Sequence, residues 1–259
     1  MRVPKHIVDA RRTRLRDWIR QDGFLPLAEI CRGLEISEAT ARRDMQAIAD
    51  DGHITRTFGG ALADYNSAFA SLGERAKQAP GGKAFIAQRA LRQVPKQGNV
   101  FLDAGTTVLA LARLLARRKG QTLTVVTNSV AVATVLGGAP GITLHLLGGV
   151  FLHRQATLFG DEAVAALARW RLDAAFLGAE AMNRDGIWNS HRQVIELQQA
   201  VLRRARQSFV LIDATKAGRT TPHRVAAWRD APALITDAAP AALAAAGIIL
   251  PRRQTVPIS

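Results

Sequence analysis

The sequence predicts an α/β protein in which a small, mainly helical domain precedes a larger domain built on a parallel β-sheet. Two observations support this prediction. Short amphipathic runs and one alternating segment fill the first 61 residues. Beyond residue 83, apolar runs of strand length alternate with helical runs, which is typical of a parallel sheet covered on both faces. The 259 residues are enough for two domains with a core.

The chain carries a formal net charge of +14, but the charge is unevenly distributed. Residues 1–61 contain 11 Lys and Arg against 9 Asp and Glu, whereas the remaining residues contain 24 against 12. The excess favours nonspecific attraction to DNA without locating a site. Cys31 is the only cysteine, which excludes an internal disulfide. No apolar run is long enough to span a bilayer and no signal-peptide pattern is present, so we expect a cytoplasmic protein without membrane contact.

Helical spacing of apolar residues predicts a first helix over residues 5–21. Leu15, Trp18 and Ile19 form its apolar stripe, and Trp18 is expected to pack against the helices that follow. Four arginines of this helix could contact DNA phosphates or lie on a solvated face: Arg11, Arg12, Arg14 and Arg16. A brief strand is expected at residues 24–25.

A second and a third helix are predicted on either side of a tight turn. The second helix is the amphipathic run 27–31, and the tight turn is 33–36, which contains Gly33. Ser37 can cap the third helix because its hydroxyl can accept a hydrogen bond from a free backbone N–H. Three residues at four- and three-residue spacing give this helix one apolar stripe: Ala41, Met45 and Ile48. Two short helices joined by such a turn indicate a helix-turn-helix.

Thr40, Arg42 and Arg43 lie off the apolar stripe of the third helix. Adjacent arginines on a polar helix fit a DNA major groove, where Arg can pair with guanine, although on these residues alone a solvated helix is an equal alternative. The next segment favours DNA binding. Residues 52–58 alternate like a strand, and the following glycines suit a hairpin tip. This hairpin is a wing, from which Arg56 could meet phosphate or the minor groove.

These residues together resemble the DNA-binding signature of the DeoR family of bacterial transcription regulators. The matching motifs are Ser-x-x-Thr-x-Arg-Arg-Asp from residue 37 and Gly-x-Ile-x-Arg-x-x-Gly-Gly-Ala from residue 52. Ala41 departs from the family, which usually has a larger β-branched residue there. The resemblance implies a winged helix-turn-helix domain over residues 1–61 that binds operator double-stranded DNA. The implied DNA-binding residues are Ser37, Thr40, Arg42, Arg43 and Arg56.

Residues 62–80 lack clear periodicity and are predicted to link the two domains, with a break at residues 80–82. Arg75 and Lys83 also resemble family residues that flank the start of the second domain. The second domain is expected to cover residues 81–259. Its predicted strands are 100–102, 123–126, 142–147, 174–177, 209–212, 233–235 and 248–250. Helices are predicted between most of them, at 108–118, 129–136, 161–170 and 194–206.

The first predicted strand of this domain is followed by Asp103-Ala104-Gly105-Thr106-Thr107, which leads into a helix. Ligands of open α/β sheets bind beyond the carboxyl ends of the strands. Gly105 allows close approach of the backbone, the helix N-terminus favours an anion, and Thr106 and Thr107 add hydroxyl groups. The loop is not a Walker motif, so it does not imply nucleotide hydrolysis. A phosphate site is one interpretation, and an ordinary Thr-capped turn is the other.

Other predicted strand ends also carry polar residues or glycines, and a sugar phosphate would suit the set. The candidates are Asp103, Asn128, Gly149, Glu180, Asp213 and Lys216. Phosphate would lie on the Thr loop and Lys216, and sugar hydroxyls on the carboxylates and the Asn. Any one of these residues is more often a cap or a turn residue, but five such strand ends together favour a binding site.

The order of these motifs again resembles the DeoR family, through its effector-binding half. The resemblance implies a sugar-phosphate sensor with a Rossmann-like parallel sheet related to ribose-5-phosphate isomerase. Arg154 lies where the family often has a basic residue, and is a further candidate for effector binding. Residues 188–191 depart from the family, which usually has small hydroxyl residues with an acid there. This departure bears on the identity of the ligand more than on its class.

The main alternative is an isomerase-like enzyme with an attached DNA-binding domain. The isomerase pattern has Asp-Gly-Ala-Asp and then a Lys-Gly stretch, whereas this chain has Leu177-Gly178-Ala179-Glu180 and no such lysine. We therefore expect a regulator with no catalytic residue, metal or cofactor. Because repression is the commoner mode in the resembling family, we expect a repressor of sugar or carbohydrate metabolism genes. A homo-oligomer, dimeric or higher, is expected to place several DNA-binding domains on repeated half-sites.

Overall fold

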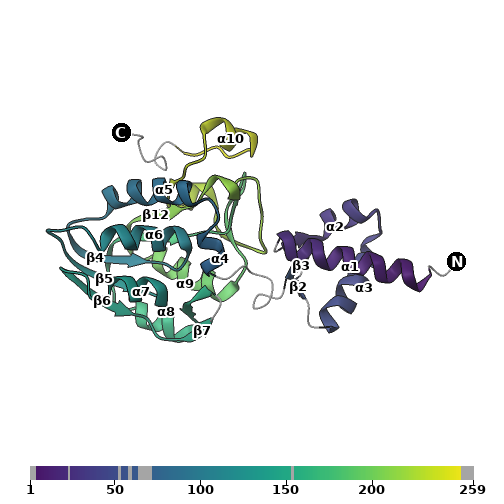
Figure 1. The fold of residues 1–259 in the computed structure, drawn as a ribbon, viewed down its shortest axis with the longest axis horizontal. Helices are drawn as coiled ribbons and strands as arrows, with labels where there is room; N and C mark the ends of the chain where they lie inside the picture. The colour runs from purple at the N-terminus through teal and green to yellow at the C-terminus, as the bar shows by residue number, and fades with distance from the viewer. Residues whose placement is uncertain are drawn as a thin grey trace. The chain divides into compact units, whose positions relative to one another are not determined.

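The computed structural model describes residues 4–22, 24–51, 54–57, 60–63, 72–152 and 155–251. The chain divides into two compact units, residues 1–70 and 71–259 (Figure 1). Each unit is described by itself below. Within the described residues, every helix is too short or too polar to cross a lipid bilayer.

The N-terminal unit has the winged helix-turn-helix architecture that the sequence predicts. Its helices are α1 (Lys5–Asp22), α2 (Leu27–Leu34) and α3 (Glu38–Asp50). Its strands are β1 (Phe24–Pro26), β2 (Ile54–Thr57) and β3 (Gly60–Ala63). The three strands form an antiparallel sheet in the order β1-β3-β2, in which β2 and β3 make the wing. The hairpin tip, residues 58–59, is outside the described residues.

The apolar stripes of the three helices meet in one small core. It contains residues from α1, α2, α3 and the wing: Leu15, Ile19, Leu25, Leu27, Ile30, Ala41, Met45, Ile48, Ile54 and Ala61. Trp18 packs against the edge of this core, as the sequence predicts. The stripe on α3 is therefore occupied by tertiary packing, which leaves its other faces to solvent or a partner.

The turn between α2 and α3 differs from the sequence prediction. Gly33 does not lie in the turn, because it is inside α2. The left-handed residue that ends α2 is Glu35, with φ 52° and ψ 43°. Gly33 is needed for another reason: a Cβ atom there would lie 2.2 Å from Cη2 of Trp18. The glycine allows the indole ring to lie against the backbone of α2.

We expect Gly33→Ala to lower the free energy of unfolding of the N-terminal unit by about 1–2 kcal/mol, because the added methyl overlaps the Trp18 ring. In an open helix the same change is normally stabilising by up to about 1 kcal/mol. Gly81→Ala is the matched control, since Gly81 lies in a helix with no atom within 4 Å of the added Cβ. Calorimetry of the two variants should give shifts of opposite sign. A stabilised Gly33→Ala protein would contradict this packing.

The C-terminal unit is built on a six-stranded sheet in which every neighbouring pair is parallel. The strand order is β14-β12-β9-β4-β5-β6. The strands are β4 (Gln97–Leu102), β5 (Thr122–Thr127), β6 (Ile142–Leu146), β9 (Leu172–Gly178), β12 (Ala205–Leu211) and β14 (Ala233–Ile235). The chain winds from β4 outward to β6 and then returns to β9 on the other side of β4, so the order reverses between β4 and β9.

Helices cover both faces of this sheet, as expected for nearly continuous apolar strands (Figure 1). One face packs against α5 (Pro80–Gln93), α6 (Thr106–Leu115) and α7 (Val130–Leu136). The other packs against α8 (Asp161–Leu167) and α9 (Arg192–Leu202). Residues of β4 alternate between the two cores: Val100 and Leu102 face α5 and α6, whereas Phe101 faces α8 and α9. The predicted fold class is confirmed.

Smaller elements complete this unit. They are α4 (Leu72–Ala76), α10 (Pro240–Ala245), the hairpin β7 (Val150–Leu152) with β8 (Thr157–Phe159), and the antiparallel sheet of β10 (Ala181–Asn183), β11 (Gly186–Asn189) and β13 (His223–Ala226). Two short 3-10 helices lie at Ala214–Lys216 and Trp228–Asp230.

Two sequence predictions about elements are wrong. Residues 248–250 do not form a strand, although Ile248 is buried in an apolar cluster, so their apolar character reflects packing rather than pairing. The expected break at residues 80–82 is instead the first turn of α5, where Pro80 is favoured because it needs no N–H partner. The segment predicted as a linker, residues 62–80, thus includes the end of β3, all of α4 and the start of α5.

Candidate functional site

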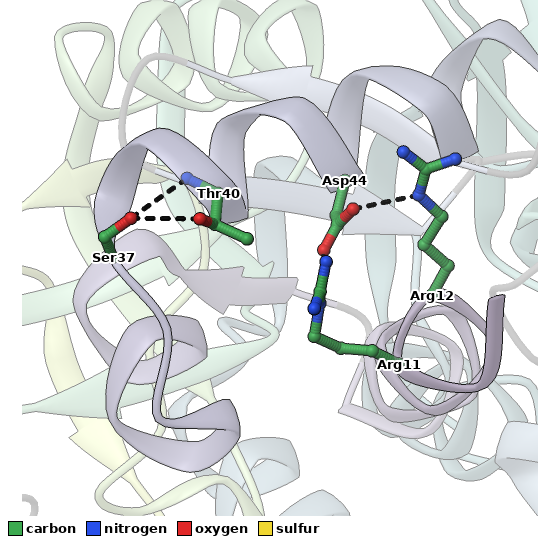
Figure 2. Close-up of polar contacts among 5 residues, drawn as sticks. All are labelled: Arg11, Arg12, Ser37, Thr40 and Asp44. Carbon is green, nitrogen blue, oxygen red and sulfur yellow. Dashed lines mark hydrogen bonds and ion pairs between the residues drawn. The ribbon is translucent and has the colours of Figure 1, made fainter. Parts of the chain in front are cut away.

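The third helix of the N-terminal unit begins with the cap that the sequence predicts. Ser37 precedes α3, and its hydroxyl accepts a hydrogen bond of 3.3 Å from the backbone N–H of Thr40. The two hydroxyl groups share a second hydrogen bond of 3.0 Å (Figure 2). Ser37 and Thr40 therefore fix the start of α3, which is the end that a recognition helix presents to the base edges.

Arg42 and Arg43 are exposed on α3, as the periodicity predicts. Arg42 forms an ion pair of 3.5 Å with Glu38, and because both side chains are exposed this pair contributes little. The Arg43 guanidinium makes no hydrogen bond or ion pair with the residues that the structure describes. Both groups can therefore reach a partner. Arg56 lies in β2, but its side chain is outside the described part of the chain.

Asp44 is the unexpected member of α3, because it places a carboxylate on the buried face of the helix. The side chain is 2% exposed and accepts hydrogen bonds from Arg11 Nε at 2.6 Å and Arg12 Nε at 2.9 Å (Figure 2). The sequence placed these arginines on phosphates or in solvent, and neither alternative included this carboxylate. The signal was present, since position 44 is three residues after Ala41 and so falls on the apolar stripe.

The order of strands in the C-terminal unit brings four candidate residues to one edge of the sheet. Asp213, Glu180, Asp103 and Asn128 follow β12, β9, β4 and β5, which are consecutive neighbours in the sheet. Because parallel strands end at the same edge, these residues lie in one row. The row spans the point where the strand order reverses, which is where ligands of open α/β sheets bind.

Asp103 links the end of β4 to the end of β9 through hydrogen bonds. One carboxylate oxygen accepts the N–H of Ala104 at 2.8 Å, and the other accepts the N–H of Gly178 at 3.2 Å and Gln198 Nε2 at 2.6 Å. Burial raises the pKa of the Asp103 carboxyl, and these donors act in the opposite direction. All three partners donate, so the arrangement suits a carboxylate that accepts.

The network continues from Gln198 to Glu180 through a segment that departs from the family pattern. Gln198 Oε1 accepts from Asn189 Nδ2 at 2.7 Å, and Asn189 Oδ1 accepts from the N–H of Glu180 at 2.9 Å. The Glu180 carboxylate in turn accepts from the N–H of Ser190 at 3.0 Å and from the Ser190 hydroxyl. Burial raises the pKa of the Glu180 carboxyl. Asn189, Ser190 and Gln198 were not predicted as members of the site.

The loop at residues 103–107 leaves the N-terminus of α6 open. Gly105 is the residue before the helix, has φ 124°, and provides no side-chain cap for it. A Cβ atom at Gly105 would meet nothing within 4 Å, so the glycine is needed for its backbone conformation rather than for packing. Thr107 is buried, whereas Thr106 is partly exposed. The Thr-capped turn that the sequence left open as an alternative is thus not what caps this helix.

Three cations interact electrostatically with the carboxylates of the same edge. Lys216 lies in the 3-10 helix after β12, and its ammonium has no hydrogen bond or ion pair with the described residues. Burial lowers the pKa of Lys216, while Asp213 and Glu180 raise it and Arg75 lowers it. Burial likewise lowers the pKa of Lys83, on which Asp213, Lys216 and Arg75 also act. Arg75 and Lys83, whose role the sequence left open, therefore belong to this cationic cluster of Arg75, Lys83 and Lys216.

Several buried polar atoms near this edge have no partner among the described residues. They are Arg75 Nε, Gln155 Nε2 and Asn128 Oδ1. Arg75 donates to Gln155 Oε1, and Asn128 Nδ2 donates to Thr157 Oγ1 at 3.1 Å, so each residue is held while one polar atom is left over. Buried polar groups are nearly always paired, and leftover ones point to a solvent molecule or a ligand.

Two further candidates differ from the rest. Gly149 has φ 122°, and a Cβ atom there would lie 2.3 Å from the carbonyl oxygen of Phe159. Close packing of the β7–β8 hairpin thus accounts for this glycine without a ligand. Arg154 is outside the described residues.

Comparison with known proteins agrees with this two-part geometry. Residues 11–66 match the model of a DeoR-like helix-turn-helix domain, and residues 78–238 match that of a DeoR C-terminal sensor domain. The chain belongs to the DeoR family. Its N-terminal unit is the family's DNA-binding domain, its C-terminal unit is the family's sensor domain, and the protein is a transcriptional regulator of DeoR type.

Relatives in the DeoR family match over most of their length. The chain is 31% identical to the transcriptional repressor GlcR of Bacillus subtilis, covering 86% of each chain. It is 33% identical to the lactose phosphotransferase system repressor of Lactococcus lactis, covering 81% of this chain and 83% of the relative. It is 26% identical to the glycerol-3-phosphate regulon repressor of Escherichia coli, covering 86% and 88%.

The solved structures that this DeoR-family chain resembles include ribose 5-phosphate isomerase A of Methanocaldococcus jannaschii. The identity is 19%, the TM-score is 0.39, and the match covers 52% of each chain. The β subunit of eIF2B from Chaetomium thermophilum matches with 17% identity and a TM-score of 0.40, covering 56% of this chain and 40% of that one. Similarity at this level has no bearing on activity.

Proposed function

We propose that the protein is a repressor that binds operator DNA and whose affinity for the operator is set by a phosphorylated sugar. The single observation that supports a sensor function is the row of polar residues at the point where the strand order reverses. The cationic cluster acts on these residues, and its hydrogen-bonding groups are not all paired with the described residues. Relatives that repress operons of sugars and of glycerol 3-phosphate support the class of genes.

The ligand chemistry follows from the charges at this edge. Lys216 supplies a partly buried ammonium with no partner among the described residues, and the open N-terminus of α6 supplies backbone N–H groups, so both suit a phosphate. Sugar hydroxyls would be bound by Asp213, Glu180 and Asn128, whose Oδ1 is left over. Asp103 already accepts three hydrogen bonds, so its part is chiefly to hold the backbone of β9 in place.

We expect affinity for the sugar phosphate to fall as pH rises in the alkaline range. Burial lowers the pKa of Lys216 and Lys83, so their ammonium groups lose protons at a lower pH than ordinary lysines. Stability should change in the opposite direction. In this pH range the two lysines bind more protons in the unfolded chain than in the folded one, so the free energy of unfolding of the ligand-free protein should increase as pH rises. Calorimetric titration with the best compound of a sugar-phosphate panel measures the first trend.

Lys216→Met should weaken that binding by about 1.5–3 kcal/mol and flatten its pH dependence. Lys119→Met is the matched control, because Lys119 is exposed and its loss removes the same charge. Equal affinities for the two variants would exclude Lys216 from the phosphate site.

An isomerase with an attached DNA-binding domain is the competing proposal. Leu177, where the isomerase pattern has a carboxylate, is buried in the apolar core beneath α8 and α9 and can transfer no proton. Glu180 is the nearest carboxylate in sequence, and its oxygen is engaged by Ser190. We therefore propose binding without turnover. A compound that stabilises the protein in a thermal-shift panel should be recovered unchanged, and conversion to an isomer would refute the proposal.

Operator binding is expected to depend on Arg43, whose guanidinium is exposed on α3 without a partner among the described residues. If it pairs with a base, Arg43→Ala costs about 1–3 kcal/mol of binding free energy and relaxes specificity at one position. The measurement uses operators selected from a random duplex library by the wild-type protein. Unchanged affinity and specificity would remove Arg43 from the interface.

The link between the two halves is an allosteric coupling. A coupling free energy of about 1–3 kcal/mol would change operator affinity roughly 5- to 150-fold. We propose a homo-oligomer, dimeric or higher, that places two or more DNA-binding units on repeated half-sites. Analytical ultracentrifugation with and without the best sugar phosphate tests this, and a monomer in both conditions would refute it.

A further inference from the structure

In the contact between α1 and α3, two arginines pair with one carboxylate. Asp44 lies at the centre of the buried face of α3 with a side-chain exposure of 2%, and two arginines of α1 bind it. One carboxylate and two guanidinium groups leave a net charge of +1 on the surface of the DNA-binding unit. A single arginine would neutralise Asp44, so the second one calls for an explanation.

The positions of the two arginines on α1 follow from helical geometry. Leu15 and Ile19 mark the buried stripe of α1. At about 100° per residue, Arg11 and Arg12 lie on either side of that stripe, so both reach the same carboxylate from opposite sides. Figure 2 shows α1 nearly end-on, with the two side chains rising to meet Asp44 from α3. The carboxylate thus sets the distance between the two guanidinium groups.

The way in which Asp44 is bound leaves most of each guanidinium free. Each arginine uses its Nε atom, at 2.6 Å for Arg11 and 2.9 Å for Arg12. A guanidinium has five N–H donors, and the four that belong to the terminal nitrogens of each arginine have no partner among the described residues. In Figure 2 the terminal nitrogens of Arg12 point away from the carboxylate. Arg12 is 36% exposed and Arg11 17%, so the pair is open to solvent.

We propose that Asp44 is a positioning residue that holds Arg11 and Arg12 as a phosphate-binding pair beside the recognition helix. The pair lies along the side of α3 that includes Thr40 at its N-terminal end, and so flanks the helix that enters the major groove (Figure 2). Terminal guanidinium nitrogens bind phosphate oxygens well, often two at a time. Contacts of this kind fix register and orientation on the duplex and do not read sequence. The inference rests on DNA binding by the N-terminal unit.

The test uses a fluorescein-labelled duplex of random sequence, because phosphate contacts need no operator. Binding of the full chain is measured by anisotropy at several NaCl concentrations, and the slope of log K against log salt reports the number of phosphates neutralised. Arg12→Met keeps the aliphatic stem and leaves Asp44 paired with Arg11. We expect it to reduce the slope by about 1, and the double variant with Arg11→Met by about 2.

Arg14→Met is the matched control, since Arg14 is exposed on the same helix and its loss removes the same charge. It should change the slope by much less than Arg12→Met. Equal slopes for these two variants and the wild type would overturn the proposal. A wild-type protein that shows no salt-dependent binding would instead refute DNA binding by this unit, and the two failures are thus distinguishable.

Asp44→Asn separates positioning from bulk charge. The change makes the protein more positive by one, so simple attraction predicts tighter binding to random DNA. If Asp44 positions the pair, Asp44→Asn binds more weakly and with a smaller slope, because two guanidinium groups lose their fixed orientation. Binding that is tighter, with an unchanged slope, would overturn the proposal. If calorimetry shows that this variant has lost the N-terminal transition, the Arg12→Met result decides.

Discussion

Asp103→Asn is expected to destabilise the C-terminal unit by about 2–4 kcal/mol and to abolish the response to a sugar phosphate. Both oxygens of Asp103 accept, and all three partners are N–H donors. An asparagine can accept at its oxygen alone, so its NH₂ group would face a donor in a buried place. The same bonds hold Gly178 at the end of β9, where the ligand would lie, so stability and binding should be lost together.

Calorimetry of the full chain measures this loss, and Asp161→Asn is the matched control. Asp161 is an exposed carboxylate in the first turn of α8, and the same isosteric change there should cost less than about 1 kcal/mol. Asp103→Asn should leave binding to random DNA unchanged, because the N-terminal unit has a core of its own. A variant as stable as the wild type would show that the carboxylate is not needed to join β4 to β9.

Gly149→Ala is expected to cost about 2–4 kcal/mol, as a consequence of backbone geometry and not of ligand contact. The residue has φ 122°, which side chains rarely adopt, and the new Cβ atom would lie 2.3 Å from the carbonyl oxygen of Phe159. Backbone cannot move aside as the tip of a flexible side chain can. The hairpin of β7 and β8 should therefore be distorted, and the pairing of Val150 in β7 with Phe159 in β8 should be disturbed.

Gly148→Ala is the control for this substitution. Gly148 is the preceding residue, its φ is ordinary, and a Cβ atom there meets nothing within 4 Å. It should leave the melting temperature almost unchanged. If Gly149→Ala is as stable as wild type but no longer responds to a sugar phosphate, Gly149 contacts the ligand and the packing explanation is wrong.

The sequence was sufficient to predict the features that follow from a local periodic pattern. The stripe of Ala41, Met45 and Ile48 gave α3 its position and its exposed arginines, because a helix places residues three and four apart on one face. Apolar strands bounded by polar residues gave the parallel sheet and the edge at which Asp103 and Glu180 gather, because parallel strands share one direction.

What the sequence missed depends on contacts between distant segments. Gln198 binds Asp103 across 95 residues, and nothing in the helical pattern of α9 sets it apart from a surface glutamine. The place of Asp44 on the apolar stripe of α3 could be read from the sequence, but its partners could not, since they lie 32 and 33 residues earlier on another helix. Gly33 was placed in the turn, because a tight turn and a close ring contact can both require a glycine and only the tertiary structure separates them.

Lys83 connects the cationic cluster to the first described element of the C-terminal unit. Its ammonium donates to the backbone oxygens of Arg75, in the last turn of α4, and of Gln78, just after the helix. A helix of five residues is too short to persist by itself, so α4 relies on this outside donor for its last turn. An anion that draws the Lys83 ammonium away from these oxygens would leave them without that donor. We therefore expect the helical order of α4 to depend on where the Lys83 ammonium lies, so that occupation of the sheet edge by an anion would be felt at the start of the C-terminal unit.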